Sequence, residues 1–92
     1  MSDQGDDYSS RGILLKRTCF ACPEQYDAFD GRGRKVGYLR LRHGIFRVDC
    51  PTSDGKTVLR GHPNGDGIFE HDERKEWLEK AITAIREWKT DN

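Results

Sequence analysis

The stretch Tyr38–Cys50, YLRLRHGIFRVDC, decides the fold that we predict for this chain. Apolar and polar residues alternate on both sides of a His43-Gly44 pair, which is typical of two half-buried strands joined by a tight turn. Gly accepts the positive φ that a two-residue hairpin turn requires, and His does so less often. The stretch therefore predicts a β-hairpin with His43 and Gly44 as its loop.

A two-residue loop fixes the register of this hairpin. It places Arg42 opposite Ile45 and Arg40 opposite Arg47, and successive side chains then point to opposite faces of the sheet. The apolar face holds Leu39, Leu41, Phe46, Val48 and Cys50. The polar face holds Tyr38, Arg40, Arg42, Ile45, Arg47 and Asp49.

The end of the chain predicts one amphipathic helix, from about Glu70 to Lys89, with Asp72 as its N-cap. Apolar residues recur there at helical spacing, and we expect three of them to cover the apolar face of the hairpin: Leu78, Ile82 and Ile85. Further β-leaning segments lie at residues 13–20, 25–29 and 56–60. The predicted fold is α+β, an antiparallel β-meander of four to five short strands with one C-terminal helix packed on one face.

The composition indicates one small domain with a modest core, because only 34% of the 92 residues are hydrophobic and 35% are charged. Residues 1–10 are polar and lack periodicity, so we interpret them as a disordered tail and residues 11–92 as the domain. The sequence contains no recognisable secretory signal and no apolar run of membrane-spanning length. We therefore expect a cytoplasmic protein that does not bind a membrane.

The formal net charge is zero, but the charges are segregated along the chain. Residues 11–60 hold eleven Lys or Arg against five Asp or Glu, whereas residues 61–92 hold five against eight. Such asymmetry permits an acidic partner such as nucleic acid. We expect instead that the acidic helix neutralises the basic sheet within the fold, because the pI of about 6.8 lies far below the basic range of nucleic-acid-binding domains.

The polar face of the hairpin is the candidate binding surface, with Tyr38, Arg40, Arg42 and Arg47. Arg40 and Arg47 are expected directly opposite one another, and like charges at that distance are unfavourable unless they are neutralised. The neutralising group is either internal, from Asp27, Asp49 or the helix, or external, from a phosphate or an acidic partner. Tyr38 beside the arginines offers a stacking surface. The alternative is a sheet face that is merely solvated.

The cysteines raise a separate hypothesis, a zinc site. Cys19 and Cys22 have the C-x2-C spacing of a zinc knuckle, and Cys50 supplies a third thiol. Ser53 stands where a second knuckle would have its other cysteine, so the fourth ligand would be a histidine, with His62 best placed. The alternative is that these cysteines behave as small apolar groups, as buried thiols commonly do.

No nucleophile, base and orienting group can be combined from this sequence, so we predict a protein that is not an enzyme. The segments 24–51 and 62–82 resemble small uncharacterised proteins of bacteriophages and prophages. The resemblance lies in Tyr-Asp-x-Phe-Asp at 26–30, Val-Gly-Tyr-Leu-Arg-Leu-Arg at 36–42 and Gly-Asp-Gly at 65–67. It implies an accessory protein of a mobile element in a bacterial host, without an assigned activity.

Three hypotheses follow for the function. The first is a binding module that presents the arginine-bearing face to a protein partner or to a second copy in a homodimer. The second is a nucleic-acid-binding protein that uses the same residues. The third is a small module stabilised by zinc.

Overall fold

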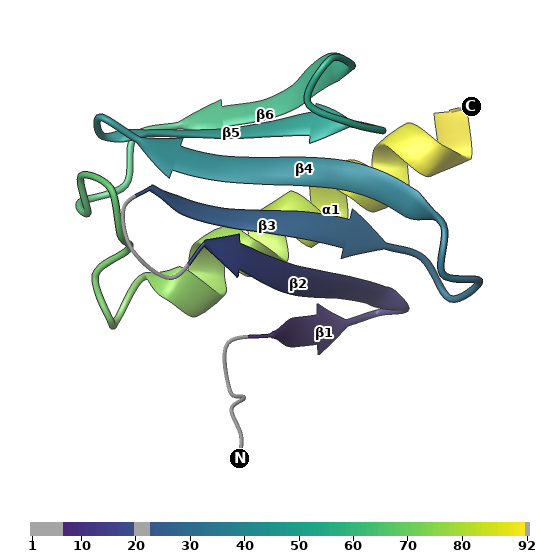
Figure 1. Ribbon diagram of the computed structural model, residues 1–92, viewed down its shortest axis with the longest axis horizontal. Helices are drawn as coiled ribbons and strands as arrows, with labels where there is room; N and C mark the ends of the chain where they lie inside the picture. The colour runs from purple at the N-terminus through teal and green to yellow at the C-terminus, as the bar shows by residue number, and fades with distance from the viewer. Residues whose placement is uncertain (1–6, 20–22, 92) are drawn as a thin grey trace.

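The computed structural model describes residues 7–19 and 23–91. Its strands form one antiparallel sheet in chain order, and the helix crosses one face of that sheet (Figure 1). The elements are β1 (Tyr8–Ser10), β2 (Ile13–Cys19), β3 (Glu24–Phe29), β4 (Lys35–Arg42), β5 (Ile45–Cys50), β6 (Lys56–Gly61) and α1 (Arg74–Asp91). The predicted α+β meander with a C-terminal helix is confirmed, with a sheet of six strands in place of four to five.

The β4–β5 hairpin has the predicted turn and register. His43 and Gly44 have φ values of 55° and 74°, the two positive values of a type I′ turn. Arg42 pairs with Ile45, and the pairing continues from there to the far end of the hairpin as expected. The Gly44 N–H also donates to the Asp66 carbonyl at 2.6 Å, which holds the tip of the hairpin against the loop that precedes α1.

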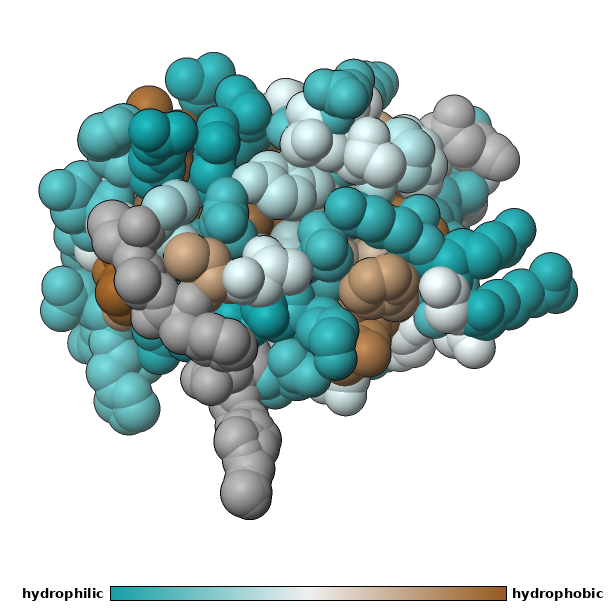
Figure 2. Space-filling model, viewed as in Figure 1, coloured by the Kyte–Doolittle hydropathy of each residue, from teal (hydrophilic) through white to brown (hydrophobic). Residues whose placement is uncertain are grey.

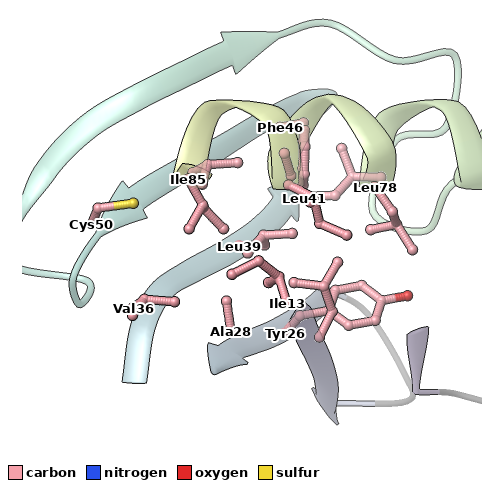
Figure 3. Packing of buried hydrophobic residues seen from close by; sticks show 14 of the residues in the cluster. Ile13, Tyr26, Ala28, Val36, Leu39, Leu41, Phe46, Cys50, Leu78 and Ile85 are labelled. Carbon is pink, nitrogen blue, oxygen red and sulfur yellow. The ribbon is translucent and has the colours of Figure 1, made fainter. Parts of the chain in front are cut away.

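The core lies between the sheet and α1 (Figure 3). The predicted apolar face of the hairpin is buried there, and the helix covers it with Leu78, Ile82 and Ile85. Cys50 belongs to this core and is 1% exposed, and its burial raises the pKa of the thiol to about 11. The neighbouring strands add Ile13, Leu15, Tyr26, Ala28 and Val36.

The first strand falls where we expected disorder. Tyr8–Ser10 form β1, although residues 1–10 were predicted to be a disordered tail, and residues 1–6 of that tail lie outside the described residues. Glu79 of α1 fixes this short polar strand, because its carboxylate accepts hydrogen bonds from the hydroxyls at both ends of β1 and from Arg11 at 2.8 Å. This strand pairs with β2 and is anchored by polar contacts to a distant helix, so its three residues show no hydrophobic alternation that would predict it.

The helix begins at Arg74, four residues after the predicted start at Glu70. Glu73, and not the predicted Asp72, precedes the first helical residue, and the Trp77 N–H donates to its carbonyl at 3.1 Å. The Glu73 carboxylate accepts three backbone N–H groups, those of Asn64 (2.8 Å), Gly65 (2.7 Å) and Glu70 (2.9 Å). These bonds hold the preceding residues in a turn, so the helix cannot extend through them.

Gly61 allows close contact between β6 and the helix, and we expect Gly61→Ala to lower the free energy of unfolding by about 1–3 kcal/mol. A Cβ at this position would lie 2.5 and 2.6 Å from carbons of the Trp77 indole, which packs against Phe46 and under Lys80. Urea denaturation measures the change. Gly31→Ala is the control, since a Cβ there meets no atom within 4 Å. Equal effects of the two substitutions would contradict the packing argument.

Candidate functional site

We call the face of the sheet opposite α1 the open face, which is turned toward the viewer in Figure 1. Four arginines, the arginine cluster, gather at the end of this face beside the β4–β5 turn: Arg40, Arg42, Arg47 and Arg60. Together with His43 and Ile45 they line a hollow of about 250 Å³. Figure 2 shows hydrophilic side chains over the same ends of β4, β5 and β6.

Three members of the cluster form a row across adjacent strands. Arg40 on β4 pairs with Arg47 on β5, and Arg47 pairs with Arg60 on β6. Side chains that are directly opposite in antiparallel strands have Cβ atoms about 5 Å apart, so their charges repel in the absence of a counter-charge. The row continues the predicted Arg40–Arg47 pair by one residue, Arg60, which was not among the predicted binding residues.

The acids of the open face neutralise only part of this charge. Asp49 is buried, and its carboxylate lies 3.2 Å from Arg47 Nε and accepts a hydrogen bond from the Thr57 hydroxyl at 2.6 Å. Asp27 pairs with Lys35 at 3.0 Å. Among residues 7–19 and 23–91, no ion pair joins a carboxylate to the other three members of the cluster, Arg40, Arg42 and Arg60.

The acidic helix does not neutralise the cluster, because α1 lies on the opposite face of the sheet. Its carboxylates form ion pairs with other cations: Glu79 pairs with Arg11 at 2.8 Å and Glu76 with Lys80 at 3.2 Å. The prediction that the acidic helix neutralises the charge of the basic sheet is therefore wrong for the arginine cluster. The open face keeps an excess of positive charge.

Tyr38 lies beside the cluster, two residues before Arg40 on β4 and on the same face. Its hydroxyl donates to Gln25 Oε1 at 2.6 Å, which fixes the orientation of the half-buried ring. The Lys35 ammonium lies 5.9 Å from the ring centroid. The four residues of the predicted binding surface thus share one face.

An apolar patch continues the open face beyond Tyr38. Leu14 on β2 is 39% exposed and pairs with Phe29 on β3, and brown surface appears over this end of the two strands in Figure 2. The open face therefore carries arginines at one end, an aromatic ring in the middle, and the exposed Leu14 and the half-buried Phe29 at the other end.

The predicted zinc ligands are not brought together. Cys19 ends β2 on the side of the β4–β5 turn, whereas Cys50 ends β5 on the opposite side. Three strand intervals of about 4.8 Å separate β2 from β5, while Zn–S bonds are about 2.3 Å long, so these thiols cannot share an ion. His62 follows β6 on the side remote from Cys50. Cys22 lies outside the described residues. The predicted four-residue zinc site is nevertheless wrong, because its other three ligands, Cys19, Cys50 and His62, do not lie together.

A buried carboxylate that the sequence did not reveal joins three parts of the fold. Glu24 is 0% exposed and forms two hydrogen bonds with Arg74, at 2.8 and 3.1 Å. It also accepts the Phe69 N–H at 3.0 Å and the Tyr26 hydroxyl. Burial by itself raises the pKa of this carboxyl, but these hydrogen bonds outweigh it and hold the pKa below its usual value. Its inaccessibility indicates a structural role.

The fold and the open face define a small α+β domain with a basic sheet surface. Comparisons with protein-family models, curated proteins and solved structures find no significant match. Within the described part of the chain, no helix has both the length and the apolar character needed to cross a membrane.

Proposed function

We propose that this protein is a small non-enzymatic binding module that engages an anionic partner with the arginine cluster. The observation that carries the proposal is the group of Arg40, Arg42 and Arg60 around one hollow without a carboxylate partner among the described residues. Guanidinium groups are weakly hydrated and present several donors in a fixed plane, which suits carboxylate, sulfate and phosphate oxygens. An anionic partner would remove the repulsion within the row.

The charge of the open face argues against a homodimer built on it. A second copy would bring its own arginine cluster against the first, and like charges across an interface cost binding energy. A partner that supplies negative charge has no such cost. We propose further that this binding belongs to an accessory protein of a mobile element in the bacterial cytoplasm, in line with the resemblance of the sequence to phage and prophage proteins.

The proposal predicts where an anionic polymer binds. Titration of a heparin fragment into ¹⁵N-labelled protein at low salt should shift the amide resonances of residues 38–47 and 58–61. The shifts should weaken as salt is added, because screening and counterion competition oppose contacts between exposed charges. Shifts confined to α1, or no shift at about 50 mM salt, would overturn the proposal.

A further inference from the structure

We infer that the anionic partner is a single-stranded nucleic acid that crosses the open face, with phosphates on the arginine row and a base on Tyr38. The inference rests on the proposed function and adds the class of partner. It combines two features of the open face that a simple anion site does not need together, a row of cations and an adjacent aromatic ring.

The arginine row suits a phosphodiester chain. Arg40, Arg47 and Arg60 project from three adjacent strands about 4.8 Å apart, so the row spans about 10 Å of the face. A chain laid along this row meets a guanidinium group on each strand. Arg42 extends the positive surface toward the turn. The buried Asp49 lies opposite Tyr38, and its carboxylate is paired with Arg47 Nε at 3.2 Å.

The ring of Tyr38 gives the open face a surface on which a nucleic-acid base can stack. Residues two apart on a strand are about 7 Å apart on the same face, so the ring lies within one nucleotide of the guanidinium of Arg40. Its hydroxyl is held by Gln25 at 2.6 Å, and a ring that is already oriented loses little freedom when a base stacks on it. Leu14 and Phe29 extend the apolar part of the surface beyond it. Basic grooves with aromatic side chains are the usual platforms for single strands.

The same surface is poorly built for a duplex. Sequence-reading proteins commonly insert a helix or a β-ribbon into the major groove. Here α1 lies behind the sheet, and the tip of the β4–β5 hairpin is held down by the hydrogen bond from Gly44 to Asp66. An acidic peptide could meet the arginines but gains no base stacking from Tyr38. Charge and aromatic surface together therefore favour single strands.

Fluorescence anisotropy at low salt tests the inference with matched probes of about fifteen nucleotides, a length near the upper end for one small domain. The probes are oligothymidylate, an abasic strand with the same number of phosphates, and a duplex of equal length. A heparin fragment tests general anion binding. We expect oligothymidylate to bind roughly tenfold more tightly than the abasic strand, because stacking of a single base contributes about that much.

Two variants test whether base stacking depends on the Tyr38 ring. Tyr38→Leu should abolish the preference for oligothymidylate over the abasic strand, whereas Tyr38→Phe keeps the ring and should retain it. If wild-type protein binds both strands equally, or prefers the duplex, the inference fails, while heparin binding at the cluster would still support the proposed function. If none of the anions binds at low salt, both fail.

Discussion

Glu24→Gln should lower the free energy of unfolding by about 3–5 kcal/mol, the usual cost of removing one partner of a buried ion pair. The substitution leaves the Arg74 guanidinium without its bidentate acceptor and weakens the bonds from the Phe69 N–H and the Tyr26 hydroxyl. Arg74 begins α1 and Phe69 lies in the loop before it, so the loss loosens the attachment of that loop to β3. Urea denaturation monitored by tryptophan fluorescence measures the change.

A surface carboxylate provides the control. Glu87→Gln removes an exposed charge from α1 and should change the free energy of unfolding by less than about 0.5 kcal/mol. A Glu24→Gln variant as stable as Glu87→Gln would show that the buried network contributes no stability. Replacing Glu24 and Arg74 together with apolar residues should restore part of the loss, since buried pairs can often be exchanged for apolar side chains.

The same network makes stability dependent on pH. The pKa of Glu24 is lowered in the folded protein, so the unfolded chain binds more protons near and below pH 4.5, the ordinary value. Its contribution is therefore fully present above that pH and is lost as the pH falls toward the folded-state pKa. Glu24→Gln should accordingly flatten the decline of stability in acid, measured by urea denaturation between about pH 3 and pH 7.

Replacing Arg40, Arg47 and Arg60 together by Gln should weaken binding of a heparin fragment by roughly three- to a hundredfold. Each exposed ion pair contributes about 0.2–1 kcal/mol, and the row offers three cations to one polymer. Because Arg47→Gln removes the ion pair with Asp49 and leaves that buried carboxylate with the Thr57 hydroxyl, urea denaturation verifies that the variant is folded. Anisotropy at fixed low salt measures the affinity.

The hairpin could be predicted because all its determinants are local. Alternation of residues fixes the two faces, and His43 and Gly44 fix the length of the turn, so the register of β4 on β5 follows without any distant contact. The helix was recognised for the same reason, from its apolar spacing. Its start was wrong because Glu73 bonds to the backbone of residues up to nine positions away.

Arg60 was missed because β6 departs from strict alternation. The pairing of β5 with β6 shifts between Val48 and Asp49, where Val58 is an extra residue on β6. This irregularity places Thr57 and Arg60 on the same face, although an odd number of positions separates them. A period of two therefore assigns one of these side chains to the wrong face.

Glu24 was missed because its partners are remote in sequence. Arg74 and Phe69 lie 50 and 45 positions further along the chain. A lone Glu between a proline and a glutamine resembles an exposed surface residue in the sequence. The charge balance was misjudged for a related reason, since totals along the chain do not say on which side of the sheet the helix packs.

The most direct test of the central claim, that the arginine cluster binds anions, compares two triple variants of equal net charge. One replaces Arg40, Arg47 and Arg60 by Gln. The other replaces by Gln three exposed cations outside the cluster: Arg32, Lys75 and Arg86. We predict that only the first loses affinity for the heparin fragment and has a shallower dependence of log Kd on log salt concentration. Equal losses in both variants would mean that net charge alone governs binding and that the arginine cluster is not a specific anion site.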